Sequence, residues 1–140
     1  MSHRPASPLE AAVERVGDRW SLLLVEALLG GARRFGELAE RVPGISTNVL
    51  SQRLKQLEQA GVVVARPYSR RPLRLAYELT GPGLELAGAL RLLAHWGARS
   101  SGEVRAPRHE ACGTPMEPRW YCPTCARQVD DPQAEGLRFF

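Results

Sequence analysis

The sequence predicts a mainly α-helical domain with one small β-hairpin, of the α+β class, followed by a short cysteine-bearing tail. Apolar residues recur at intervals of three and four over most of the first 100 residues, as on helices that bury one face. A β-branched run at 62–64 interrupts this pattern, and all three cysteines lie between Cys112 and Cys125. A chain of 140 residues provides for one compact domain with a modest core and an appendage.

Composition and charge narrow the classes of function. Hydrophobic residues make up 44% and charged residues 24%, as in ordinary globular proteins. The longest apolar run, 22–29, contains Glu26 and is far shorter than the roughly 20 residues that cross a bilayer. Residues 1–8 lack the apolar stretch of a secretory signal, so we expect a cytoplasmic protein in a reducing compartment. Residues 1–100 carry 14 Lys and Arg against 9 Asp and Glu, which favours an anionic partner.

Two helices are expected at the start of the domain. The first follows from the apolar spacing over 9–16 and stops at Gly17. Asp18 is suited to cap the second helix, which Gly30 and Gly31 end. The second helix has a broad apolar stripe, formed by Trp20, Leu23, Leu24, Ala27 and Leu28.

A short helix, a tight turn and a longer helix are predicted next. The short helix at 35–39 cannot continue past Pro43 and Gly44, because proline lacks an N–H donor and glycine favours a turn. Ser46 can cap the longer helix, 47–60. Its apolar face consists of Leu50, Leu54 and Leu57. The opposite face is polar, which leaves it free to contact a partner.

A basic hairpin is predicted after this pair of helices. Strands are expected at 62–64 and 73–80, joined by a turn-prone connection at 66–72 that contains Arg66, Arg70 and Arg71. A helix, a turn, a second helix and then a hairpin are the elements of a winged helix-turn-helix domain.

The last helix and the tail complete the predicted organisation. Thr80 can cap a long helix at 82–98 that is apolar around most of its circumference, so one domain face cannot cover it. Residues 100–102 are typical of a linker. We therefore expect a flexible N-terminus at 1–7, the winged helix-turn-helix domain at 8–100, a linker at 101–108 and a small Cys/His tail at 109–140.

The polar face of the longer helix is suited to reading duplex DNA. Short hydrogen-bonding side chains near its start can reach base edges in the major groove; the candidates are Thr47, Asn48, Ser51 and Gln52. Basic side chains at the margins can contact phosphates; the candidates are Lys55, Arg70, Arg71 and Arg74. Taken alone, the same face could also be an ordinary solvated surface.

The sequence also resembles the HxlR-type transcription regulators. The resemblance lies in residues 16–24 (VGDRWSLLL), 34–38 (RFGEL), 43–46 (PGIS) and 50–58 (LSQRLKQLE), in the same order as in that family. The hairpin agrees with the family's series of Tyr, Pro, Arg, Tyr and Leu-Thr, here Tyr68, Pro72, Arg74, Tyr77, Leu79 and Thr80. The resemblance covers roughly residues 8 to 98.

Membership in this family implies a DNA-binding homodimer. The long last helix would pack against its partner together with the N-terminal helix, and the dimer would recognise an inverted repeat. Alternatively, the last helix only completes the core of a monomer. One departure concerns sensing: several HxlR-type members carry a reactive cysteine in a Cys-Pro sequence before the first helix. Here Ser7-Pro8 stands in that place, and a hydroxyl cannot supply thiolate chemistry.

The tail has the ligand spacing of a structural zinc site. His109 and Cys112 are separated by two residues, and so are Cys122 and Cys125. Two such turns can place three thiolates and one imidazole around a tetrahedral Zn²⁺, as in a zinc-ribbon-like tail. Two alternatives remain: three free thiols in a loosely ordered tail, or a redox pair formed by Cys122 and Cys125.

The sequence therefore predicts a regulator of transcription that binds double-stranded DNA. We expect no enzymatic activity, because no arrangement of nucleophile, base and acid is recognisable. Two other functions compete with this prediction. One is a dimeric winged-helix adaptor without affinity for DNA, and the other is a small redox protein that uses Cys122 and Cys125.

Overall fold

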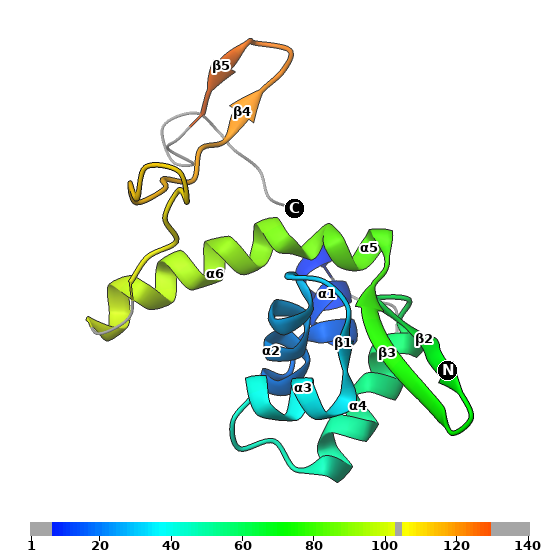
Figure 1. Ribbon diagram of the computed structural model, residues 1–140. Helices are drawn as coiled ribbons and strands as arrows, with labels where there is room; N and C mark the ends of the chain where they lie inside the picture. The colour runs from blue at the N-terminus through cyan, green and yellow to red at the C-terminus, as the bar shows by residue number, and fades with distance from the viewer. Residues whose placement is uncertain (1–6, 103–104, 130–140) are drawn as a thin grey trace. The chain divides into compact units, whose positions relative to one another are not determined.

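The computed structural model describes residues 7–102 and 105–129. The described residues up to Leu90 form one compact unit, and those from Arg91 onward form another. In the first unit, helices α1 (Pro8–Val16), α2 (Arg19–Leu28), α3 (Phe35–Arg41) and α4 (Thr47–Gln59) pack together, with a β-hairpin beside them (Figure 1). The hairpin consists of β2 (Val63–Arg70) and β3 (Leu73–Leu79), and β1 (Arg33–Arg34) pairs with β3. The order of helices, turn and hairpin confirms the predicted architecture.

The first two helices begin at side-chain caps. The Ser7 hydroxyl accepts a hydrogen bond from the Glu10 amide at 3.1 Å, and Pro8 fills the first helical position. Asp18 caps α2 by accepting hydrogen bonds from the Trp20 and Ser21 amides, both at 3.0 Å. Ser7 was expected to belong to a flexible N-terminus; its capping hydrogen bond instead makes it the start of α1.

The turn between α3 and α4 depends on local backbone chemistry. Gly44 has φ +86°, a left-handed conformation that side chains with a Cβ rarely adopt, and Pro43 precedes it. The Ser46 hydroxyl then accepts a hydrogen bond from the Val49 amide at 3.2 Å and starts α4. The sequence signals for this turn and cap are confirmed.

The hairpin is longer and its connection shorter than the sequence indicated. The sheet is antiparallel with the order β1-β3-β2, and β2 remains paired as far as Arg70, opposite Leu73. The expected connection at 66–72 therefore shrinks to Arg71 and Pro72. The turn-prone Pro67 is accommodated within β2, where the register shifts between Pro67 and Ser69, because a bulge tolerates a residue without an N–H.

The core lies between the helices and the base of the hairpin. It consists of Val16, Leu24, Val25, Leu28, Leu38, Val42, Leu50, Leu54, Leu57, Val62 and Val63. Burial of one such side chain stabilises a fold by about 1.5–3 kcal/mol. The apolar face predicted for the longer helix, which is α4, is thus the face that enters the core.

The predicted helix at 82–98 is two helices. These are α5 (Gly81–Leu84), capped by Thr80, and α6 (Leu86–Ser101). Gly83 is buried so close to Val62, the residue before β2, that an added Cβ would lie 2.2 Å from the Val62 carbonyl oxygen. α6 includes Ser100 and Ser101, which were expected to form a linker. The Ser100 hydroxyl bonds back to the Trp96 carbonyl at 3.2 Å, and Gly102, with φ +64°, follows the helix end.

The second unit contains a short hairpin, β4 (Tyr121–Cys122) and β5 (Arg127–Gln128), and a single bridge between Arg108 and Pro115. Arg108 was expected to end the linker, and it is instead part of the tail's structure. The last part of the predicted tail, 130–140, lies outside the described residues. None of the helices in the described part of the chain is long and apolar enough to span a membrane.

Candidate nucleic-acid interface

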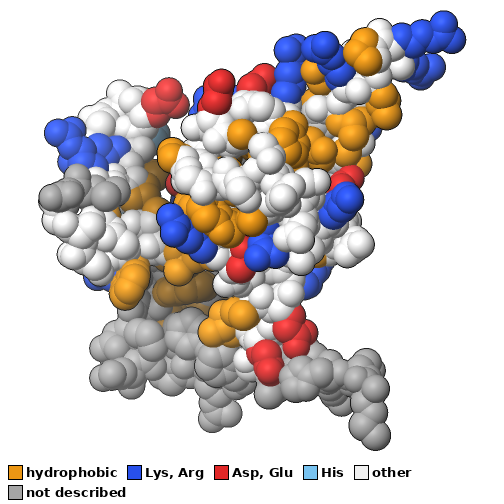
Figure 2. Space-filling model, turned by 90° about the horizontal axis from the view of Figure 1, so that it is seen from below, with side chains coloured by type: hydrophobic (Ala, Val, Ile, Leu, Met, Phe, Trp, Pro, Cys, Tyr) orange, Lys and Arg blue, Asp and Glu red, His pale blue; other side chains and the backbone are white. Residues whose placement is uncertain are grey.

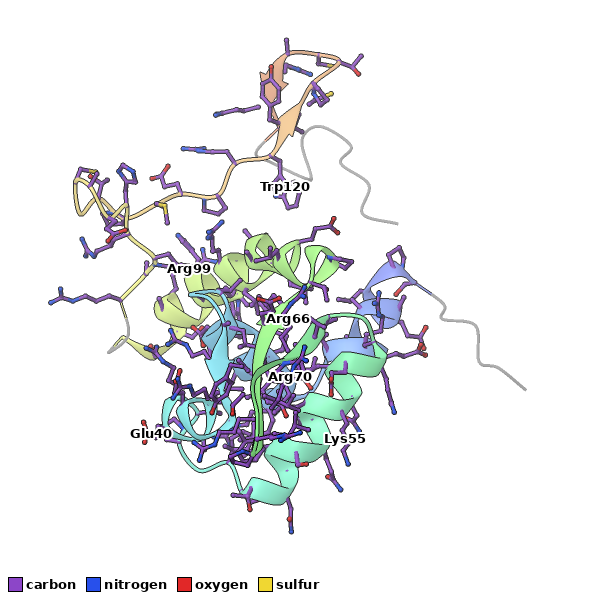
Figure 3. All side chains as sticks on the ribbon, turned by 45° about the vertical axis from the view of Figure 1, so that its right-hand side comes forward. Glu40, Lys55, Arg66, Arg70, Arg99 and Trp120 are labelled. Carbon is purple, nitrogen blue, oxygen red and sulfur yellow. The ribbon has the colours of Figure 1, made fainter. Side chains whose placement is uncertain are left out.

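The polar face of α4 is directed to solvent. Thr47, Asn48, Gln52 and Lys55 are exposed and Ser51 is half-buried, on the side of the helix opposite the three core leucines. Neither the hairpin nor any other described segment buries these side chains. Figure 3 shows Lys55 pointing away from α4. The surface that the sequence assigned to DNA is therefore open to a partner.

Arg53 belongs to α4 but not to this face. Its Nε lies 3.0 Å from the Asp18 Oδ1, and its guanidinium also donates a hydrogen bond to the Gln56 side chain at 2.9 Å. Asp18 caps α2, so the ion pair connects α4 to the start of α2. Partial burial opposes ionisation of Asp18, but hydrogen bonds from the Ser21 hydroxyl and amide, with the charge of Arg53, lower the pKa of this carboxyl below its ordinary value of 3.8.

The other end of α4 is also held by an arginine. Arg15 of α1 donates a hydrogen bond to the Ala60 carbonyl, at the C-terminal end of α4, where positive charge is favoured by the helix dipole. Gly61, with φ +73°, then turns the chain into β2, and the Val62 amide bonds to the Leu57 carbonyl at 2.9 Å. The connection between α4 and the hairpin is therefore short and hydrogen-bonded.

The hairpin carries three exposed arginines. Arg70, Arg71 and Arg74 are all exposed, and among the residues described by the structure none of them pairs with a carboxylate. By contrast, Arg66 on the same hairpin forms an ion pair with Glu78. Lys and Arg side chains gather at one projecting corner of the surface in Figure 2, and Figure 3 places Arg70 and Arg66 on the hairpin beside α4. Unpaired guanidinium groups keep their full charge available for phosphates.

One basic side chain of this region was not predicted. The Arg34 guanidinium lies 4.5 Å from the centre of the Tyr68 ring, which places a further positive charge between α3 and the hairpin. Arg34 also lies 3.8 Å from a Glu37 carboxylate oxygen. β1, which brings Arg34 opposite Ala76, is only two residues long, so no periodic pattern could reveal it. The adjacent Arg33-Arg34 pair was the available signal.

The predicted metal ligands lie in two separate pairs. His109 Nδ1 is 3.3 Å from Cys112 Sγ, and the Cys125 amide is 3.5 Å from Cys122 Sγ. None of the three cysteines forms a disulfide. Across 7–102 and 105–129 no three His, Cys, Asp or Glu side chains are close enough to hold one metal ion together. The zinc site therefore stays a prediction.

The arrangement of α3, turn, α4 and basic hairpin defines a winged helix-turn-helix domain. The sequence profile of the HxlR-like helix-turn-helix family matches residues 15–104, more than half of the chain. The chain belongs to this family. The resemblance noted in the sequence is thus confirmed.

Relatives and solved structures agree with this membership. The chain is 37% identical over 134 residues to the uncharacterised HTH-type transcriptional regulator Rv3095 of Mycobacterium tuberculosis, covering 92% of this chain and 84% of that one. It is 32% identical to the HTH-type transcriptional regulator YodB of Bacillus subtilis, covering 69% and 86%. The structure is similar to that of a transcription factor from Pseudomonas aeruginosa, PA1374, with a TM-score of 0.70, 32% identity and coverage of 91% and 88%. A match over more than nine tenths of the chain includes part of the cysteine-bearing tail.

Proposed function

We propose that this protein regulates transcription by binding duplex DNA through the exposed face of α4 and the arginines of the hairpin. The observation that carries the proposal is the open polar surface of α4 next to three exposed arginines that pair with no carboxylate of the described residues. Exposed positive charge beside a polar helix face favours an anionic ligand over an ordinary solvated surface. Side chains that can reach base edges favour DNA over the protein partner of an adaptor.

The side chains divide into two roles. Asn48 and Gln52 carry amides that can form paired hydrogen bonds to an adenine edge, and the smaller hydroxyls of Thr47 and Ser51 can bond to several bases. Lys55 and the three hairpin arginines contact phosphates, which contribute affinity and fix the register without reading sequence. The ion pair between Arg53 and Asp18 holds α4 in the orientation that presents these amides.

A homodimer is part of the proposal. Leu9 and Val13 of α1 are 62% and 53% exposed, and Leu93 and Trp96 of α6 are 52% and 64% exposed. Leu86 and Leu90 at the start of α6 pack against the core, but no side chain of α6 is fully buried by the described part of the chain. A second copy of the chain could bury these exposed large apolar side chains in a symmetric dimer interface. Two copies would place their α4 helices about 34–36 Å apart, one turn of DNA, and would recognise an inverted repeat.

The test is binding of the purified full-length chain to fragments of its own genome, measured by fluorescence anisotropy at several salt concentrations. A regulator stays bound to a small set of fragments at salt concentrations at which random duplex dissociates, and its affinity falls steeply as the salt concentration increases. A chain that retains no fragment at any salt concentration is the dimeric adaptor instead.

A further inference from the structure

The tail contains two turns with the same backbone geometry, thirteen positions apart. The bridge between Arg108 and Pro115 encloses His109 and Cys112, and the pairing of Tyr121 with Gln128 encloses Cys122 and Cys125. In each turn, the bracketing residues are separated by the same number of positions, and the two candidate ligands occupy the same places between them. A single helical or extended segment would not repeat in this way.

The residue after the second ligand is left-handed in both turns. Gly113 has φ +70° and Ala126 has φ +52°, and Ala126 is the one non-glycine residue with positive φ among 7–102 and 105–129. Side chains with a Cβ avoid this conformation unless the surroundings require it. Its repetition at matched positions shows that the two turns share the same backbone conformation directly after the second ligand.

The first turn already presents its two ligand atoms together. His109 Nδ1 and Cys112 Sγ are 3.3 Å apart. Two ligands of a tetrahedral Zn²⁺, with a Zn–S distance of about 2.3 Å and a Zn–N distance of about 2.0–2.1 Å, lie about 3.6 Å from each other. The pair thus has nearly the spacing of one edge of a zinc tetrahedron.

Neighbouring groups suit thiolates in both turns. The Cys112 thiol donates a hydrogen bond to the Thr114 hydroxyl at 3.2 Å, and this hydroxyl can donate in return once the sulfur has lost its proton. The Cys125 amide donates a hydrogen bond to Cys122 Sγ at 3.5 Å. Donors at this distance stabilise a ligand sulfur that has lost its proton, as groups around a metal's first ligands commonly do. Cys112 and Cys125 are exposed and Cys122 is half-buried, so an ion can reach them from solvent.

We infer that one Zn²⁺ joins the two turns, bound by His109, Cys112, Cys122 and Cys125 of a single chain. The nine residues between Cys112 and Cys122 are long enough for the second turn to close on the first, since an extended chain spans about 3.3 Å per residue. On binding, three S–H bonds break and three Zn–S bonds form, His109 contributes a neutral ring nitrogen through Nδ1, and three protons pass to solvent. Four protein ligands leave no position for water, so the site is structural.

The experiment uses the untagged full-length chain, passed over a sizing column in the presence of EDTA. Elemental analysis should give about one zinc per chain, and the three thiols should react slowly with a disulfide reagent until a stronger chelator removes the metal. Replacing the zinc with Co²⁺ should give the visible absorption of a tetrahedral thiolate complex. Helix content measured by circular dichroism reports whether the first unit remains folded.

Variants separate ligation from general damage to the tail. Cys122→Ser and His109→Gln should lose at least nine tenths of the zinc, whereas His109→Cys should retain it, because a fourth thiolate replaces the imidazole. His95→Gln, on α6, removes the other histidine of the described residues and should leave the zinc content unchanged.

Three results would overturn the inference. Three freely reactive thiols without metal mean an unliganded tail. A Cys122–Cys125 disulfide that forms in air in a zinc-free chain means a redox pair. One zinc for two chains means that the ligands come from different copies. None of these results bears on DNA binding by α4.

Discussion

At the scale of single residues, the proposed interface assigns base reading and phosphate contact to different side chains. Asn48 and Gln52 are exposed amides on α4, and Arg71 is an unpaired cation at the tip of the hairpin. The two kinds of contact have different effects on binding. Base contacts determine the preference among sequences, and phosphate contacts determine the affinity for any duplex. Substitution of each kind should therefore have a distinct signature.

Gln52→Ala should relax sequence preference. Loss of a paired hydrogen bond to one base costs about 1–3 kcal/mol on the preferred fragment, roughly a five- to 150-fold loss of affinity, and little on random duplex. Gln59→Ala, which removes the same exposed amide from the last position of α4, is the matched control and should bind as the unaltered protein does. Equal losses on both kinds of duplex would contradict base reading by Gln52.

Arg71→Ala should weaken binding to all sequences alike. Because each phosphate contact releases counterions, the slope of log affinity against log salt should become shallower by about 0.9 for the one contact removed. Arg91→Ala, which removes an exposed charge from α6, should leave the slope unaltered. The measurement is a salt titration by anisotropy on preferred and random duplexes; an unchanged slope for Arg71→Ala would exclude the phosphate contact.

Asp18 makes stability depend on acid. Its pKa is lower in the folded chain than its ordinary value of 3.8, so its contribution is complete above that value and is lost as the pH falls through the folded-state pKa. Asp18→Asn keeps a capping oxygen but loses the charge that faces Arg53. The difference in unfolding free energy between the two proteins should be constant near neutral pH and should shrink below pH 3.8. Urea titrations at several pH values measure it, and a difference that grows in acid would refute this assignment.

At the scale of elements, local signals predicted what local chemistry determines. The α3–α4 turn follows from Pro43, Gly44 and Ser46, all of which act within a few residues. Features that depend on distant partners were not predictable. β1 is defined by its pairing with β3, and Gly83 in α5 packs against Val62, which lies 21 positions earlier in the chain. The paired length of the hairpin was underestimated because Pro67 is tolerated at a bulge, which a turn-forming composition conceals.

Gly83→Ala should destabilise the first unit. Alanine normally stabilises a helix relative to glycine by roughly 0.5–1 kcal/mol, but here the added methyl would meet the Val62 carbonyl oxygen at 2.2 Å. Relief of such a clash costs about 1–3 kcal/mol, so the sign reverses. Gly36→Ala in α3, where the new methyl meets nothing within 4 Å, is the control and should be neutral or stabilising. Urea unfolding measures both; a stabilised Gly83→Ala protein would show that β2 yields easily.

At the scale of the whole molecule, the sequence predicted the family, the polar face of α4 and two pairs of candidate metal ligands. It did not predict the further arginine beside the hairpin or whether the two ligand pairs meet. The polar side of α4 was predictable because one helical period separates it from the core leucines. Arg34 was missed because its place beside Tyr68 arises from tertiary packing. The four tail ligands are named by their spacing, but spacing within a pair says nothing about the approach of one pair to the other.

Leu93→Glu should convert the proposed dimer into a monomer. Leu93 is 52% exposed on α6, and a carboxylate there would be buried without a partner in a dimer. Leu73→Glu makes the same change at a hairpin side chain that is 66% exposed, and should leave the molar mass unaltered. Light scattering after size exclusion gives the mass. A monomeric unaltered protein, or a Leu93→Glu protein that remains dimeric, would exclude α6 from self-association.

The carboxylate of Asp18 has a mechanical consequence for α4. Its Oδ1 accepts hydrogen bonds from two amides at the start of α2 and also pairs with Arg53. Rotation of α4 about its axis would therefore break the ion pair with the residue that caps α2. At its far end, the Arg15 hydrogen bond to Ala60 resists sliding in the same way. A helix anchored at both ends would present a fixed surface to the DNA that we propose it binds. We therefore expect that any signal controlling this protein changes the placement of entire copies along the duplex and leaves the orientation of α4 within each copy unaltered.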